Sequence, residues 1–183
     1  MNDRPGFVTG SGIPMRFAAQ DGSVIDVYQA TTNLTDESGQ SYPYTINTLL
    51  DNALGAAGAY GVFTVNAHTD YTSSAESDAV VASAKARGVP IVSAKQMLRW
   101  LDGRNGSTFT NLAWTGTTLS FSVAAAAGAT GLQFMLPTRA GSMRLSTLTL
   151  NGAAVTSTVQ MIKGIEYAFV TANAGQYVAT YAP

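Results

Sequence analysis

The chain has 183 residues, which is enough for one large domain or two small ones. Hydrophobic residues make up 46% of the sequence and charged residues only 11%, so a packed core is expected and wholesale disorder is excluded. The net charge is −1, lysine and arginine are scattered and cysteine is absent, which argues against nucleic-acid binding and excludes disulfides and thiolate metal sites.

The chain is predicted to begin with two short strands, at residues 13–17 and 24–28, joined by an Asp-Gly turn. Arg16 and Asp26 lie one on each strand. They are candidate substrate-binding residues, and the alternative is a surface ion pair or a solvated strand face. The polar segment 31–42 is expected to form a loop, and a loop between a strand and a helix is a common place for ligand contacts.

An amphipathic helix is predicted next, followed by a strand that leads to the single histidine. Apolar residues recur with the spacing of one helical face over residues 46–57. They are Ile46, Leu49, Leu50, Ala53, Leu54 and Ala57. Residues 62–67 are then predicted to form a strand that ends at His68. In sheets followed by helices, catalytic and binding groups collect at the carboxyl ends of strands.

Two further helices with a short strand between them, at residues 90–92, complete this part of the chain. Ser73 and Glu76 have the spacing of a helix-capping box, and Ser93 and Gln96 repeat it. The residues expected to face inward are Ala75, Ala79, Ala82 and Ala86 in the first helix and Met97, Leu98 and Leu101 in the second. This alternation indicates an α/β arrangement with parallel strands, and a helical bundle with apolar linkers is the alternative.

After residue 104 the helical period disappears and strand-length segments recur about every ten residues. The Asn151-Gly152 pair predicts a two-residue hairpin turn. About seven short strands fit an Ig-like β-sandwich. The sequence therefore predicts an α/β domain over residues 1–104 and an all-β Ig-like sandwich domain over residues 105–183.

His68 is the first candidate for acid–base chemistry, because no other side chain in the chain has an ordinary pKa near neutrality. Asp70 is the second predicted catalytic residue and would orient the imidazole. Asp70 could also share a metal with His68, and the carboxylates Asp26, Asp36, Glu37 and Asp70 can help to bind one only if the fold brings them together. The alternative is a structural histidine that hydrogen-bonds a loop. Zinc needs three protein ligands, and one histidine without cysteine is a poor supply, so no metal site is predicted within this chain.

Four segments carry a family resemblance: FTVNAH at residues 63–68, AKARGVP at 84–90, IVS at 91–93 and QML at 96–98. This order of a strand ending in histidine, a helix, a Gly-Val-Pro turn, a short strand and a helix resembles the closing part of a polysaccharide deacetylase-type catalytic domain. That family has a distorted β/α barrel, so the resemblance implies that the α/β domain over residues 1–104 is the end of such a barrel. The resemblance implies that His68 is the late-strand histidine that serves as the family's catalytic acid.

The family's early Asp-Asp motif and its metal-binding His-x-x-x-His pair have no counterpart here. The resemblance therefore implies the C-terminal region of an exported carbohydrate-active hydrolase, inactive as this fragment, whose longer parent would bind a zinc-like divalent metal. A degenerate relative is the alternative. Two other hypotheses stay open: a non-enzymatic glycan-binding or structural cell-surface module, and a self-contained hydrolase using His68 and Asp70 with a serine or threonine.

The expected setting is the cell exterior or the cell envelope, because the composition is neutral and rich in Thr, Ser, Gly and Ala. A signal peptide is not present in this chain, and no run of about 18 apolar residues predicts a membrane span. The expected partner is a polysaccharide or cell-wall glycan. Exposed edges of a truncated barrel also predict a homodimer formed through strand pairing, or covering of these edges by the loop at 31–42.

Overall fold

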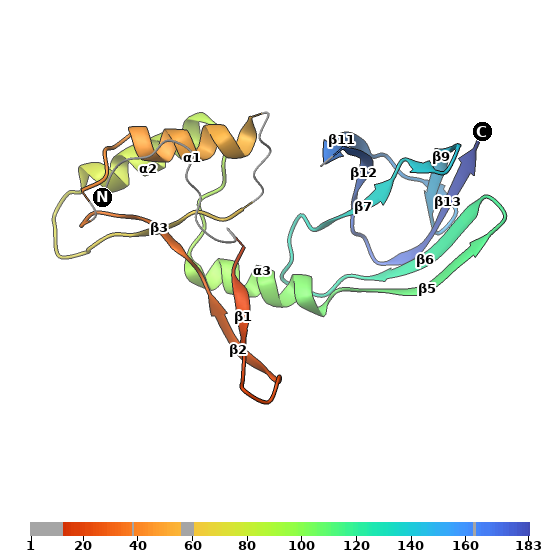
Figure 1. Ribbon diagram of the computed structural model, residues 1–183, viewed down its shortest axis with the longest axis horizontal. Helices are drawn as coiled ribbons and strands as arrows, with labels where there is room; N and C mark the ends of the chain where they lie inside the picture. Colours follow the sequence, from red (N-terminus) through yellow and green to blue (C-terminus); the bar gives the residue numbers. More distant parts are fainter. Residues whose placement is uncertain (1–12, 38, 56–60, 163) are drawn as a thin grey trace. The chain divides into compact units, whose positions relative to one another are not determined.

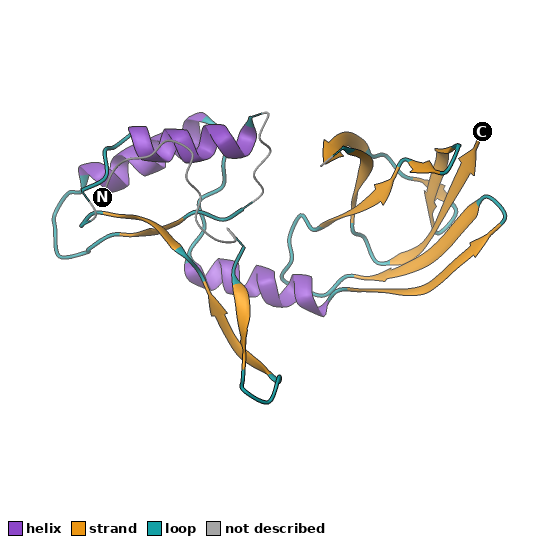
Figure 2. Ribbon diagram, in the orientation of Figure 1, coloured by secondary structure: helices purple, strands orange, loops and turns teal. Residues whose placement is uncertain are grey.

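The computed structural model describes residues 13–37, 39–55, 61–162 and 164–183 (Figure 1). It divides into two compact units, Met1–Val92 and Ser93–Pro183. Strands account for 42% of the described residues and helices for 22%; Figure 2 shows where both kinds of element lie. Among the described residues, no helix has the length and apolar character needed to cross a membrane.

The first unit combines a hairpin with a small layer of two strands and two helices. Its elements are β1 (Met15–Ala18), β2 (Val24–Gln29), β3 (Thr32–Thr35), α1 (Tyr44–Leu54), β4 (Thr64–Asn66) and α2 (Ala75–Ala86). Strands β1 and β2 pair antiparallel through the predicted Asp-Gly turn, in which Gly22 has a φ of 84°. Strands β3 and β4 pair parallel, with α1 as the connection between them.

Leu34 of β3 is the centre of the first unit's core and is fully buried. It packs with the buried face of α1, namely Ile46, Leu49 and Leu50, and with Val80 and Ala84 of α2. The predicted face of α1 is thus confirmed up to Leu50, whereas Leu54 is 60% exposed and Ala57 lies outside the described residues. A bidentate ion pair between Asp51 and Arg87, with N–O distances of 2.7 and 3.2 Å, joins the two helices.

The second unit consists of one helix and antiparallel strands. Its elements are α3 (Ala94–Gly106), β5 (Thr108–Thr115), β6 (Thr118–Ala124), β7 (Gln133–Pro137), β8 (Arg139–Ala140), β9 (Met143–Leu150), β10 (Ala153–Ala154), β11 (Thr158–Ile162), β12 (Ile165–Thr171) and β13 (Gly175–Ala182). One sheet has the order β10-β9-β13-β6-β5, with β8 also paired to β9. The other has the order β11-β12-β7. The larger sheet is curled like half of a barrel (Figure 1).

Both sheets contribute to the core of the second unit. Phe121, Phe134 and Tyr177 form an aromatic cluster in which the rings of Phe121 and Tyr177 stack at 5.3 Å between centroids. The buried Tyr181 hydroxyl donates a hydrogen bond to the carbonyl of Pro137 at 2.8 Å, linking β13 to the end of β7. Helix α3 packs on this unit through Trp100, whose indole N–H donates to the carbonyl of Thr130.

The structure overturns the predicted fold class and the predicted family resemblance. The described part of the chain is predominantly β and has three short helices, and it is neither part of a β/α barrel of the deacetylase type nor such a barrel followed by a separate Ig-like domain. The physical reason is that β3 and β4 are the one parallel pair among the strands that the structure describes, whereas a barrel needs a closed ring of parallel strands. Alternation of side chains predicts strands, but it does not encode the order or the curl of a sheet.

Several local predictions were also wrong. Residues 90–92 form no strand, and Ile91 and Val92 are about half exposed. Helix α2 is capped by Ser74 rather than Ser73, and this one-residue shift goes with a buried face made of Val80, Ser83 and Ala84 instead of the predicted alanines. Leu98 was expected to face inward and is 47% exposed. The loop predicted at residues 31–42 contains strand β3.

Two local predictions made from short motifs are confirmed. The Ser93–Gln96 capping box is present, with the Gln96 backbone N–H donating to the Ser93 hydroxyl and the Ser93 backbone N–H donating to the Gln96 side chain. Asn151 and Gly152 both have positive φ angles, of 50° and 85°, at the turn between β9 and β10. Both motifs depend only on residues close in sequence, so the arrangement of the distant elements does not affect them.

Candidate functional site

The candidate site lies at the carboxyl ends of the parallel strands β3 and β4. Asp36 follows directly after Thr35, the last residue of β3, and His68 comes two residues after Asn66, the last residue of β4. Parallel strands end at the same edge of a sheet, so these two side chains meet although they are 32 residues apart in sequence.

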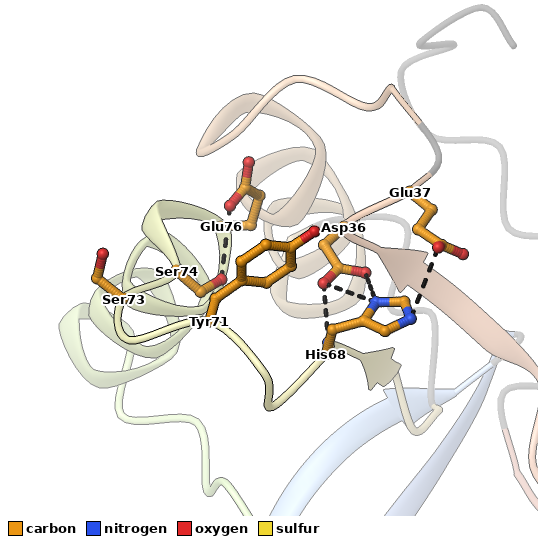
Figure 3. A pocket seen from close by; sticks show the side chains of 7 residues that line it. All are labelled: Asp36, Glu37, His68, Tyr71, Ser73, Ser74 and Glu76. Atoms are coloured by element: carbon orange, nitrogen blue, oxygen red, sulfur yellow. Dashed lines mark hydrogen bonds and ion pairs between the residues drawn. The ribbon is translucent and has the colours of Figure 1, made fainter.

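The Asp36 carboxylate holds His68 by two groups at once (Figure 3). The backbone N–H of His68 donates a hydrogen bond to Oδ2 of Asp36 at 2.8 Å. The imidazole Nδ1 lies 3.0 Å from Oδ1 and 3.1 Å from Oδ2 of the same carboxylate. The Asp36 side chain is only 11% exposed and that of His68 is 43% exposed, so the carboxylate is largely covered and the imidazole remains accessible.

The other imidazole nitrogen of His68 points toward Glu37. The distance from Nε2 to Oε1 of Glu37 is 3.6 Å, which allows electrostatic attraction but is too long for a hydrogen bond. Within the described part of the chain, Nε2 therefore keeps its hydrogen-bonding capacity for a ligand. The Glu37 side chain is 76% exposed and can move aside at little cost.

The two partners shift each other's pKa in opposite directions. The hydrogen bond that the imidazole makes to the Asp36 carboxylate, followed by the negative charges of Asp36 and Glu37, raises the pKa of His68 above its ordinary value, with a smaller contribution from Asp70. The hydrogen bond donated by the His68 backbone N–H is the largest cause that lowers the pKa of Asp36. The site consequently favours a protonated imidazole facing an ionised carboxylate.

An open pocket of about 250 Å³ surrounds this pair (Figure 3). It is lined by Asp36, Glu37, His68, Tyr71, Ser73, Ser74 and Glu76. The aromatic side chain of Tyr71 is 66% exposed, and Ser74 is the residue that caps α2, accepting a hydrogen bond from the Ser77 backbone N–H. The lining therefore combines an accessible ring with hydroxyl, carboxylate and imidazole groups.

The structure places the four predicted site residues in different surroundings. His68 lies in the pocket, whereas the carboxylate in contact with its imidazole belongs to Asp36. Asp70 acts on His68 only as a nearby negative charge. Arg16 and Asp26 form an ion pair at 2.9 Å on the β1–β2 hairpin, and neither lines the pocket.

Tyr71, Ser74 and Glu76 were not among the predicted site residues, although the sequence offers a partial signal for them. They follow His68 closely and lead into the first turn of α2, and the segment between a strand and the next helix is a frequent position for ligand contacts. Among the described residues, no three His, Asp or Glu side chains converge as metal ligands. The divalent metal expected for a longer parent protein stays a prediction.

Comparisons with known proteins found no relative of this chain. Protein-family models, curated proteins and solved structures were all searched, and none matches the chain. The role of the pocket is therefore inferred from its own geometry and chemistry.

Proposed function

We propose that this chain is a non-enzymatic glycan-binding module of an exported or cell-envelope protein, and that the pocket around His68 holds one sugar unit. The observation that carries the proposal is the two-thirds exposed ring of Tyr71 beside hydrogen-bonding carboxylates. A sugar ring presents an apolar C–H face and a rim of hydroxyl groups. An aromatic ring next to polar side chains offers a matching surface for both.

The polar groups of the pocket suit hydroxyl ligands. Carboxylates accept hydrogen bonds from sugar hydroxyls, and Nε2 of His68 donates a hydrogen bond when the imidazole is protonated and accepts one when it is neutral with its proton on Nδ1. Asp36 holds that imidazole from the opposite side through Nδ1, which fixes the direction of the donor. The volume of about 250 Å³ lies just below the range of roughly 300–1,000 Å³ for drug-sized ligands, so it suits a single sugar unit within a chain.

Isothermal titration calorimetry of the full chain with neutral oligosaccharides tests this proposal. Tyr71→Ala is expected to weaken binding by about tenfold, because it removes the exposed ring. Tyr44→Ala is the matched control, since Tyr44 is also exposed, at 45%, but does not line the pocket. Equal losses in the two variants, or no binding by the parent chain, would contradict a sugar site at Tyr71.

A second candidate is acid catalysis on a carbohydrate by His68, and the contact between Asp36 and His68 favours it. A carboxylate that holds a protonated imidazole is one way to position a general acid. Chromogenic glycosides and acetylated oligosaccharides incubated with the chain would release product if this candidate is correct. His68→Gln would abolish that release while leaving the far-ultraviolet circular dichroism unchanged. Binding without turnover favours the module over the enzyme.

A further inference from the structure

The pocket around His68 carries an excess of negative charge. Three of the seven described residues that line it are carboxylates, namely Asp36, Glu37 and Glu76, and none of the seven is lysine or arginine (Figure 3). The imidazole of His68 supplies one positive charge when it is protonated. Three negative charges against one positive charge leave the lining with a net charge of −2.

The basic side chains in the described part of the first unit do not compensate for this charge. They are Arg16, Lys85 and Arg87. Arg16 belongs to the ion pair on the β1–β2 hairpin, and Arg87 belongs to the one that joins α1 and α2. Lys85 lies in the last turn of α2, roughly 15 Å along the helix from Ser74 at the pocket. The positive end of the helix dipole adds only about half a charge, so the pocket stays negative.

We propose that the sugar unit held in this pocket carries a free amino group, as in a 2-amino-2-deoxy sugar. This inference rests on the proposed sugar site and names the class of its ligand. An ammonium group donates up to three hydrogen bonds, and those to carboxylates such as Glu37 and Glu76 are charge-assisted. A cation is also attracted to the face of an aromatic ring, which the two-thirds exposed Tyr71 offers in the same pocket.

The charge of the pocket disfavours the other classes of ligand. A sugar acid would bring a carboxylate against three others, and like charges repel. A neutral sugar has no group that compensates for the negative charge. A bare divalent cation needs several converging ligands, and among the described residues no three His, Asp or Glu side chains converge in this way. An amino sugar matches both the ring of Tyr71 and the carboxylates.

Calorimetric titration of the full chain with two matched tetrasaccharides tests this inference. Tetraglucosamine and cellotetraose have the same rings and the same linkage, and they differ in carrying an ammonium or a hydroxyl group on C2. At about pH 5.5 the amines are protonated and carboxylates are ordinarily ionised. Tetraglucosamine is expected to bind about five- to tenfold more tightly at about 20 mM salt. This preference is expected to shrink to about twofold or less at about 0.5 M salt, which screens the charges.

Glu37→Gln and Glu76→Gln test the carboxylates, because each variant keeps a hydrogen-bond acceptor and removes one charge. Each is expected to lower the ratio of the two affinities by about threefold. Asp78→Asn is the matched control, since Asp78 lies in the first turn of α2 but does not line the pocket. D78N is expected to leave the ratio unchanged within about 1.5-fold, because solvent and salt screen its charge. E37Q alone suffices if E76Q does not fold.

The outcomes separate this inference from the sugar site itself. Equal affinity for the two tetrasaccharides would overturn the amino-sugar ligand and leave a neutral sugar site in place. A preference for tetraglucosamine that both glutamine variants keep would also overturn it, because the ammonium group would then bind outside the pocket. Spermidine is a polyamine without a sugar ring, and equally tight binding of spermidine would replace the amino-sugar site by a general cation site. No binding of either tetrasaccharide would contradict the sugar site and this inference together.

Discussion

At the scale of single residues, the contact between Asp36 and His68 is the central feature of the pocket. It explains how one histidine acquires a defined orientation without metal ligands around it. Because the chain has a single histidine, its imidazole signals in a nuclear magnetic resonance spectrum need no further assignment. The pKa of His68 is thus directly measurable in the full chain.

Replacing Asp36 by Asn is expected to lower the pKa of His68 more than any other single substitution in the pocket. The reason is that the hydrogen bond accepted by the Asp36 carboxylate is the largest cause of the raised pKa of His68, ahead of the charges of Glu37 and Asp70. A pH titration of the imidazole signals checks this order, with Glu37→Gln and Asp70→Asn as comparisons. A larger effect of D70N than of D36N would contradict the geometry of the site.

The same pair makes the stability of the first unit depend on pH. The raised pKa of His68 contributes stability that is complete below its unfolded value and is lost as the pH rises through the folded pKa. The lowered pKa of Asp36 contributes stability that is present above its unfolded value and is lost as the pH falls through the folded pKa. Both contributions are present together between about pH 4 and 6.5.

Urea unfolding of the parent chain and of D36N across this range measures the effect. The difference in midpoint between the two proteins is expected to be largest near pH 5 and to shrink on either side, because both groups are charged in that window. A difference that does not vary with pH would mean that the pair contributes nothing through its charges.

The sequence singled out His68 as a candidate but named Asp36 only as a carboxylate that the fold would have to bring close, and the reason is physical. A strand end with a histidine is a local pattern, whereas contact with Asp36 depends on parallel pairing between segments about thirty residues apart. Strand β3 has the sequence TNLT, with Leu34 as its one large apolar residue. Such a short polar strand resembles a loop in sequence, so the edge that joins the two side chains was not predicted.

At the scale of elements, one close backbone contact joins α3 to the strands and loops of the second unit. Gly103 is buried, and a Cβ atom added there would lie 2.6 Å from the carbonyl oxygen of Ala127 and even closer to the backbone nitrogen of Ala129. Backbone atoms cannot move aside as a flexible side chain does. The glycine thus allows the helix to approach the loop between β6 and β7.

Gly103→Ala is expected to destabilise the second unit by roughly 1–3 kcal/mol, because this contact leaves no room for a methyl group. Gly106→Ala, in the same helix, is the matched control, since its nearest neighbour would be the Ala126 side chain at 3.2 Å. Chemical denaturation of the two variants separates the steric effect from the general effect of alanine in a helix. A smaller loss of unfolding free energy in G103A than in G106A would contradict the close approach of α3 to this loop.

Leu34→Ala tests the importance of β3 for the first unit. Leu34 is fully buried between the helices, so its truncation is expected to cost roughly 2–5 kcal/mol through lost burial and a cavity. Leu54→Ala removes the same atoms from a side chain that is 60% exposed, and its effect is expected to stay within about 0.5 kcal/mol. Thermal unfolding of both variants gives the comparison, and similar midpoints would place Leu34 outside the core.

At the scale of the whole molecule, the two units have separate cores, one centred on Leu34 and one on the aromatic cluster of the second unit. We therefore expect two unfolding transitions in scanning calorimetry, one for each unit. L34A is expected to lower the temperature of the first unit's transition and to leave that of Ser93–Pro183 unchanged. A single transition that shifts as a whole would show that the two units unfold as one.

The sequence predicted many strands of the second unit but not the global architecture. Turn motifs such as Asn151-Gly152 depend on local backbone geometry and were predicted correctly. Sheet order depends on contacts between distant segments; β13, for example, lies between β6 and β9. The apparent match to a β/α barrel arose from local strand and helix patterns, which do not specify how many strands pair in parallel.

The most direct test of the central claim is to follow the His68 imidazole signals while a neutral oligosaccharide is added to the full chain. A sugar in the pocket is expected to shift these signals in a saturable way, with no release of product. In Y71A the dissociation constant obtained from these shifts is expected to be about tenfold higher. Unchanged His68 signals at saturating oligosaccharide would contradict a sugar site in this pocket.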